Sequence, residues 1–275
     1  MLKYRLISFP LLLMLLGAIF FWQAGGPWLF AAAAVVLIPT ALFESGRIAE
    51  KIGVANSPRL LALCGAIGTA ILLSPIPSKE RIFAVVLTLA LPILCFGFWI
   101  AVLRRRIDAV VKIAAGSGLF VFVWAPLVLL ALIYLRDPFA FAFVVCTTKA
   151  MDTGGYIFGM LSSKLPGGNR KIAPAISPKK SWEGFFGGLL LSLVTGWLFY
   201  RFGSAAEPLS VMLAAAAIFS LGSFFGDLTE SSFKRAAGVK DSGGWLPGMG
   251  GALDLVDSFI YNGMIFWVLH SLFRG

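Results

Sequence analysis

The sequence has little charge. Charged residues make up 13% of the 275 residues and hydrophobic residues 59%, whereas soluble domains average about 25% charged and about 45–50% apolar residues with glycine counted. Because so few polar side chains cannot cover the water-facing surface of a globule of this length, the composition excludes a soluble enzyme and a disordered chain. It predicts an integral membrane protein.

Histidine and cysteine are also scarce. The single histidine, His270, lies near the C-terminus, and Cys64, Cys95 and Cys146 all lie in apolar runs, where a thiol usually serves as a small hydrophobic group. These residues offer no disulfide framework and no zinc site. Catalysis by a Ser-His or Cys-His pair is therefore not expected.

Long apolar runs predict an all-α polytopic membrane protein with about nine transmembrane helices. Each run supplies roughly the 20 residues that cross a hydrocarbon core of about 30 Å, and uninterrupted runs favour helices over a barrel. The first run is expected to be a retained span, because no clear small-x-small cleavage site follows it. The predicted spans are residues 6–22, 27–43, 59–77, 82–103, 114–135, 138–161, 184–201, 209–228 and 257–273.

The basic residues predict the orientation of the chain. Of the 23 lysines and arginines, seventeen lie in the segments on the N-terminal side of the membrane and five on the opposite side. Cytoplasmic loops carry such an excess, so the N-terminus is predicted to be cytoplasmic and the C-terminus external. The net charge of +10 then reflects topology and contact with anionic membrane lipids, and no nucleic-acid partner is expected.

The acidic residues gather in the C-terminal half, and this bias predicts the organisation of the chain. We expect residues 1–135 to form a scaffold of transmembrane helices whose spans contain no buried ionisable residue. Residues 136–275 are expected to form the catalytic region with its cytoplasmic loops. The C-terminal acids are Asp152, Glu183, Glu207, Asp227, Glu230, Asp241, Asp254 and Asp257.

Two pairs of acids have the spacing that places side chains on one helix face. Asp227 and Glu230 are three residues apart at the end of one predicted span, and Asp254 and Asp257 at the start of the next. Converging carboxylates repel one another unless a cation intervenes, and hard oxygen ligands suit Mg²⁺. The residues thus indicate a metal group of Asp227, Asp254 and Asp257. The alternative is local ion pairing with Lys234, Arg235 or Lys240.

Two loops combine glycine with basic residues. Residues 177–184 read Ser-Pro-Lys-Lys-Ser-Trp-Glu-Gly, and residues 234–251 contain Lys234-Arg235, Lys240-Asp241 and several glycines. Glycines let backbone amides approach phosphate closely, and lysines supply positive charge for it. With the acids nearby, the loops suggest a metal-nucleotide or polyphosphate site.

A charged pair is embedded in the sixth predicted span. Lys149 and Asp152 are three residues apart and can pair on one helix face, either as a structural pair or as part of a functional site. Gly154, Gly155 and Gly159 follow and would allow close approach of another helix or of a substrate.

Four ordered blocks of the C-terminal half resemble the phosphatidate cytidylyltransferase family, also called CDP-diacylglycerol synthases. They are Asp152-Thr-Gly-Gly-Tyr-Ile-Phe-Gly159, residues 176–188, Gly226-Asp-Leu-Thr-Glu-Ser231 and residues 231–257. Together the blocks cover roughly residues 150–260. The N-terminal half is similar to the family only in its hydrophobicity and short basic start.

The resemblance implies a membrane enzyme, usually dimeric, that joins CTP and phosphatidic acid to give CDP-diacylglycerol and pyrophosphate. It implies a divalent metal such as Mg²⁺ and often K⁺ as a second cation. The family's metal-site aspartates match Asp227, Asp254 and Asp257. The catalytic candidates are Asp227, Lys234, Lys240, Asp241, Asp254 and Asp257, and the candidate nucleotide and phosphate contacts are Ser177, Lys179, Lys180, Glu183, Lys234 and Arg235.

Three other functions stay open. Met249 stands where the family usually has histidine, and Leu255 where it usually has arginine, so an inactive relative is one rival. The others are a CTP-dependent lipid kinase of related architecture and an ion-coupled transporter in which Lys149, Asp152 and the aspartates line the substrate path. We favour retained activity because the three aspartates and both lysine blocks are present. Short loops without a transit peptide predict the bacterial inner membrane, with the active site facing the cytoplasm.

Overall fold

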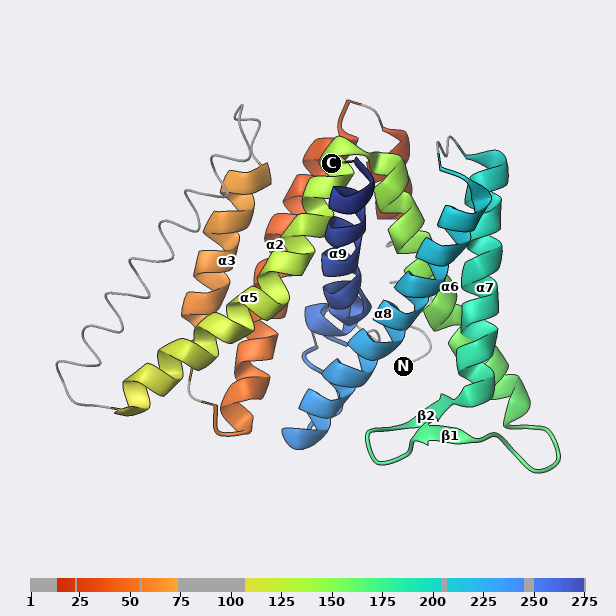
Figure 1. Ribbon diagram of the computed structural model, residues 1–275. Helices are drawn as coiled ribbons and strands as arrows, with labels where there is room; N and C mark the ends of the chain where they lie inside the picture. The colour runs from red at the N-terminus through yellow and green to blue at the C-terminus, as the bar shows by residue number, and fades with distance from the viewer. Residues whose placement is uncertain are drawn as a thin grey trace. The chain divides into compact units, whose positions relative to one another are not determined.

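The structure is a computed structural model that describes residues 14–22, 24–54, 56–73, 107–203, 207–244 and 250–274. These residues are mostly helical (Figure 1). The elements are α2 (Gly26–Lys51), α3 (Pro58–Leu73), α5 (Ile107–Arg136), α6 (Pro138–Ser162), β1 (Lys171–Ala173), β2 (Ser177–Ser181), α7 (Trp182–Phe202), α8 (Leu209–Ala236) and α9 (Ala252–Arg274). Five of the described helices, α2, α5, α7, α8 and α9, are long and apolar enough to cross a membrane.

These helices support the predicted helical membrane protein. A described helix corresponds to each predicted span from 27–43 onward, except 82–103, which lies outside the described residues. The first predicted span, 6–22, is described only from residue 14, and residues 14–21 are helical. The number of nine spans and the cytoplasmic N-terminus stay predictions.

The described part of the chain falls into two compact units. The residues up to Leu132 form the first unit together with Ala236–Val256. Ile133–Arg235 form the second unit together with the residues from Asp257 onward. The assignment of residues 1–135 to a scaffold and of 136–275 to catalysis stays a prediction.

In the first unit, α2 packs against α3, and Trp124 of α5 joins α3 through hydrogen bonds. The Trp124 indole N–H donates to the Gly65 carbonyl at 3.3 Å and lies 3.1 Å from the Thr69 hydroxyl. One prediction is wrong here. Helix α2 continues beyond residue 43 to Lys51, so it includes Glu44, whose residue is only 6% exposed. The first half of the chain therefore does contain a buried ionisable residue.

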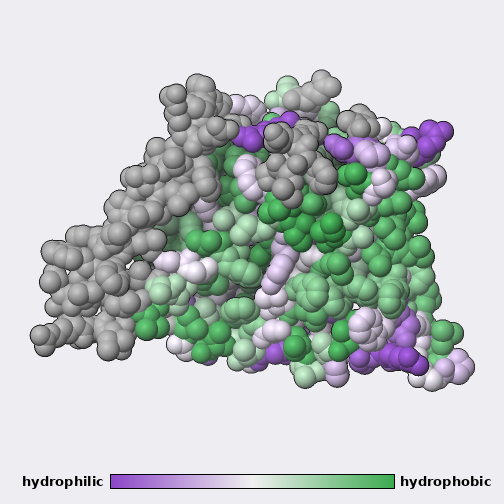
Figure 2. Space-filling view, in the orientation of Figure 1, coloured by the Kyte–Doolittle hydropathy of each residue, from purple (hydrophilic) through white to green (hydrophobic). Residues whose placement is uncertain are grey.

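In the second unit, α6 and α7 pack side by side (Figure 1). Buried polar side chains join the helices. Asn262 of α9 donates to the Thr148 hydroxyl of α6 at 2.8 Å and to the Phe219 carbonyl of α8 at 3.0 Å. Such hydrogen bonds stabilise the association of membrane helices. Lipid tails are as apolar as the helix surfaces, so no hydrophobic effect drives the helices together. Figure 2 shows apolar side chains over the middle of this unit's helices and hydrophilic ones toward the hairpin end.

A short antiparallel hairpin of β1 and β2 connects α6 to α7. Ser181 ends β2 and also caps α7, because its hydroxyl accepts the Gly184 N–H at 3.2 Å. Glu183 then accepts the Arg170 N–H with both carboxylate oxygens, at 3.1 and 3.2 Å. These bonds tie the base of the hairpin to the first turn of α7.

Glycine permits the close contact between α6 and α7. A Cβ atom on Gly154 would lie 2.8 Å from the Gly188 Cα, so the helix backbones would have to separate. We expect Gly154→Ala to lower the free energy of unfolding by about 1–3 kcal/mol. Gly118→Ala is the matched control, because a Cβ there would meet nothing within 4 Å. Thermal unfolding in detergent checks this, and equal midpoints for the two variants would contradict the packing.

Candidate active site

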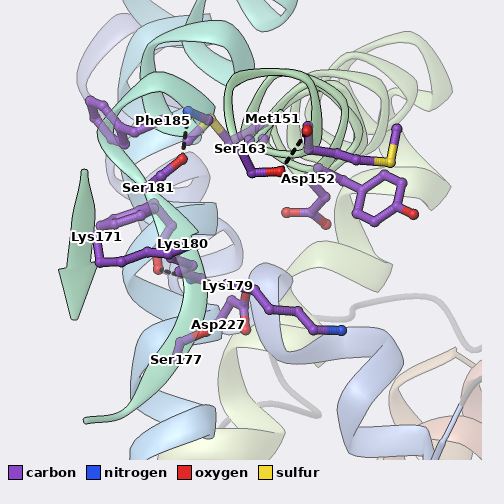
Figure 3. A pocket seen from close by; sticks show the side chains of 16 residues that line it. Met151, Asp152, Ser163, Lys171, Ser177, Lys179, Lys180, Ser181, Phe185 and Asp227 are labelled. Atoms are coloured by element: carbon purple, nitrogen blue, oxygen red, sulfur yellow. Dashed lines mark hydrogen bonds and ion pairs between the residues drawn. The ribbon is translucent and has the colours of Figure 1, made fainter. Parts of the chain in front are cut away.

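A cavity of about 500 Å³ opens in the second unit, where α6, α7 and α8 meet the hairpin. Charged and apolar side chains both line it. Figure 3 shows Lys171, Lys180 and Asp227 near the hairpin. The apolar residues of the lining include Met151 and Phe185. Charged and apolar groups in one cavity suit a ligand that carries both phosphate and hydrocarbon.

Lys180 is the most constrained of the cavity lysines. Its ammonium lies 2.9 Å from an Asp227 carboxylate oxygen, with the lysine side chain 16% and the aspartate 40% exposed. It also donates to the Phe224 carbonyl at 3.1 Å and lies 4.5 Å from the centre of the Phe224 ring. The strand β2 therefore delivers a fixed positive charge to the cavity wall.

Three carboxylates converge at the base of α8 and the start of α9. Asp227, Glu230 and Asp257 each present an oxygen, and these oxygens lie within 4.8 Å of one another. Glu230 is 5% and Asp257 7% exposed, so water screens their repulsion poorly. Lys234 offsets part of this charge through an ion pair of 2.5 Å with Glu230. Carboxylate oxygens at this spacing can share a hard divalent cation.

A hydrogen-bond network links the predicted Lys149–Asp152 pair to this cluster. The pair forms as predicted, with 3.0 Å between the ammonium and the carboxylate. Asp152 also accepts from Ser223 at 2.7 Å. The Ser258 hydroxyl lies 3.2 Å from Asp152 and 3.0 Å from Asp257, so it bridges the two acids. The pair thus positions a carboxylate of the cluster as well as filling the helix interface.

The structure brings together only part of the predicted site. Ser177, Lys179 and Lys180 line the cavity, and Asp227 and Asp257 belong to the carboxylate cluster. Two other predicted contacts hold the hairpin instead. Glu183 binds the Arg170 backbone, and Arg235 donates to the Ile176 carbonyl at 3.3 Å.

The remaining predicted residues lie in the first unit. Lys240 and Asp241 are exposed in the segment that precedes α9. Asp254 accepts the backbone N–H groups of Ser242 at 3.0 Å and Gly251 at 2.7 Å. Asp254 is not a member of the carboxylate cluster that the described residues form. Met249 lies outside the described residues.

Sequence reasoning missed three participants. Glu230 had a usable signal, since it follows Asp227 by three residues on one helix, yet it was left out of the metal group. Lys171 lines the cavity only because the hairpin folds back, and no pattern predicted the hairpin. Ser258 follows Asp257 directly, and its bridging role depends on a contact with a different helix.

Comparison with known proteins identifies the family. The sequence model described as the cytidylyltransferase family matches residues 3–273, nearly the whole chain. The chain belongs to the cytidylyltransferase family. This match includes the N-terminal half, which the sequence blocks did not cover.

Curated relatives of this cytidylyltransferase are named phosphatidate cytidylyltransferase. The chain is 45% identical over 123 residues to the protein from Staphylococcus epidermidis, which is 45% of this chain and 44% of the relative. It is 46% identical over 121 residues to that from Staphylococcus saprophyticus, 44% of each chain. It is 41% identical over 133 residues to that from Haemophilus influenzae, 46% of this chain and 44% of the relative. The chain thus spans less than half the length of the curated relatives it matches.

Proposed function

We propose that this cytidylyltransferase transfers the cytidylyl group of CTP to phosphatidic acid, giving CDP-diacylglycerol and pyrophosphate for phospholipid biosynthesis. The observation that carries the proposal is the cavity lined by both lysines and apolar side chains and bounded by helices α7 and α8, which are apolar enough to cross a membrane. Such a cavity can take a nucleotide phosphate and a lipid phosphate while the acyl chains stay among the helices. The names of the curated relatives support the same substrates.

The reaction needs no protein nucleophile. An oxygen of the phosphatidate phosphate forms a bond to the α-phosphorus of CTP. The bond from that phosphorus to the oxygen bridging to the β-phosphate breaks, and pyrophosphate leaves with the electron pair. Because a phosphate monoester carries about −1.5 to −2 charge near neutral pH, the attacking oxygen needs no general base. The site's main task is to hold two anions together.

Three lysines of the hairpin perform that task. Lys171, Lys179 and Lys180 place positive charge along one wall of the cavity. Lys180 is held by Asp227 and the Phe224 carbonyl, so its position is fixed before a substrate arrives. Fixed charges stabilise the developing negative charge on the phosphates without a reorganisation cost.

The residues fit a magnesium ion. Asp227, Glu230 and Asp257 offer carboxylate oxygens within 4.8 Å of one another, two of them on buried residues, which is a donor set for a hard cation. When bound there, Mg²⁺ would supply charge that neutralises the phosphate oxygens. Asp254, the third ligand predicted from the sequence, and K⁺ as a second cation stay predictions.

The wider setting of the enzyme is part of the proposal. We place it in the inner membrane of a bacterium as a multi-pass protein, with the active site facing the cytoplasm where CTP is available. The excess of basic residues in alternate loops supports this orientation. Homodimerisation follows from the resemblance to the family and is proposed on that ground.

The direct test is transfer of label from CTP to lipid. Purified protein in detergent with phosphatidic acid, Mg²⁺ and CTP labelled at the α-phosphate is expected to put label into the lipid phase and to release pyrophosphate. Chelation of the metal is expected to abolish both products. Label entering lipid from γ-labelled CTP instead, with a lipid alcohol as acceptor, would make the protein a kinase. Uptake of a solute into vesicles without nucleotide turnover would make it a transporter.

A further inference from the structure

Glu44 is a buried carboxylate that the proposed reaction does not use. It lies on α2, which is apolar and long enough to cross a membrane, and its residue is 6% exposed. A buried charge is costly unless hydrogen bonds compensate for it. The contacts of Glu44 therefore indicate why the helix carries it.

Glu44 accepts two hydrogen bonds from the segment at the start of α9. The Ser242 hydroxyl and the Leu253 N–H each lie 2.9 Å from the same carboxylate oxygen, Oε2. Leu253 is the second residue of α9, where the first N–H groups of a helix have no partner within the helix. Glu44 thus acts as a cap supplied by a helix about 200 residues earlier in the chain.

Asp254 completes the arrangement from the other side. It accepts from the backbone N–H groups of Ser242 and Gly251, and it also lies 2.9 Å from the Ser242 hydroxyl. A hydroxyl has one hydrogen to donate. Because Asp254 already has two backbone donors, we assign the hydroxyl hydrogen to Glu44. The serine oxygen can then accept the Asp254 N–H at 3.3 Å.

Glycines give Glu44 access to this segment. A Cβ atom added to Gly243 or Gly251 would collide with the Glu44 carboxylate. Gly250 has a φ of +94°, which side chains rarely adopt, and a Cβ there would meet the Asp254 carboxylate. The glycines of this segment therefore allow the Glu44 and Asp254 carboxylates to approach its backbone closely.

We propose that Glu44 is a positioning residue for cytidylyl transfer. It fixes the first turn of α9, and Asp257 of the carboxylate cluster follows on that helix one turn after Leu253. Its Oε2 oxygen acts as a hydrogen-bond acceptor, and its negative charge is not required. The inference rests on the proposed function for its catalytic meaning, whereas the anchoring itself can be measured without any reaction.

The anchoring is tested by hydrogen–deuterium exchange on the full-length protein in detergent. In Glu44→Ala, the Leu253 amide is expected to exchange about tenfold faster, since its acceptor is gone. In Glu44→Gln, the amide oxygen can replace Oε2, so exchange should stay within about twofold of wild type. Glu50→Ala, an exposed acid on the same helix, is the matched control and is expected to leave the exchange unchanged.

Activity supplies the second measurement. Glu44→Ala is expected to lower kcat about 10–100-fold, because small displacements of catalytic groups are costly. Glu44→Gln should restore activity to within about threefold of wild type. A merely structural role would reduce the amount of folded enzyme and leave the kcat of the folded fraction unchanged, which would overturn the proposal.

Other outcomes are equally decisive. If Gln and Ala are equally impaired, the charge itself is required and the acceptor role is wrong. If Glu44→Ala does not fold, Ser242→Ala takes its place and should speed exchange of the Asp254 amide, which loses the Ser242 oxygen as acceptor at 3.3 Å, while Leu253 stays protected by Glu44. Unchanged exchange in Ser242→Ala would overturn the anchoring. If the wild-type protein transfers no label to lipid, the proposed function fails, but the exchange results still decide the anchoring.

Discussion

Replacing Asp257 by asparagine is expected to lower kcat for CDP-diacylglycerol formation by about 10³-fold, because a metal contributes several kcal/mol to stabilising a charged transition state. The amide removes the negative charge that attracts a divalent cation. Its oxygen can still accept from the Ser258 N–H, which lies 2.6 Å from Asp257 Oδ1. The fold should therefore persist, and removal of a buried charge from an acidic cluster should not lower the thermal unfolding midpoint.

The measurement pairs kinetics with Mn²⁺ binding followed by electron paramagnetic resonance. Asp257→Asn and Asp227→Asn should both weaken Mn²⁺ binding, whereas the exposed Glu50→Gln should not. Asp254→Asn distinguishes the carboxylate cluster of the structure, which lacks Asp254, from the ligand set predicted from the sequence, which includes it. The structure places its carboxylate on the backbone of Ser242 and Gly251, so we expect a smaller loss of activity with Mn²⁺ binding retained. Lost Mn²⁺ binding in Asp254→Asn would favour the sequence-based ligand set instead.

Replacing Lys180 by alanine is expected to lower kcat/KM for CTP by about 10²–10³-fold, the range seen when one fixed stabilising donor is removed. The change deletes a constrained cation from the cavity wall. It also leaves Asp227 without its partner at 2.9 Å, which adds uncompensated negative charge where phosphates bind. Steady-state kinetics over a range of CTP and Mg²⁺ concentrations measure the loss.

Lys179 is the matched control for that substitution. It is the neighbour on the same strand, also lines the cavity, and is exposed. Lys179→Ala removes the same charge from an exposed position, so we expect a loss of about tenfold or less that shrinks as salt is added. Equal losses for the two lysines, with the same salt dependence, would mean that general attraction of anions explains the effect and that the fixed geometry of Lys180 does not.

Hydropathy predicted the helices well, because crossing a hydrocarbon core imposes length and composition. It predicted their ends poorly. The span predicted as 27–43 stops one residue before Glu44, although α2 continues to Lys51. From the neighbouring sequence alone, a carboxylate at this position indicates the end of a transmembrane span. Only the distant partners Ser242 and Leu253 show that it can lie in the helix interior.

The parts of the site whose residues lie on one helix could be predicted from the sequence. The parts that join residues of different elements could not. The spacing of Asp227 and Glu230 on α8 places both carboxylates in one cluster, as helical periodicity requires. The same reasoning paired Asp254 with Asp257, yet Asp254 binds the segment before α9 while Asp257 joins α8. Periodicity gives the face of a helix, and the packing of the chain around that face decides what each residue meets.

The glycines along the α6–α7 contact differ in how much space lies beside each of them. At Gly154 an added Cβ would strike backbone, but at Gly155 its nearest neighbour would be the Gly184 carbonyl oxygen at 3.7 Å, an ordinary contact distance. At Gly159 the nearest atom would be the Ser181 hydroxyl oxygen at 3.4 Å. Both residues line the cavity. Methyl groups at these two positions would narrow the proposed substrate cavity without forcing the helices apart, so the glycines set the bulk of the ligand that the cavity can accept.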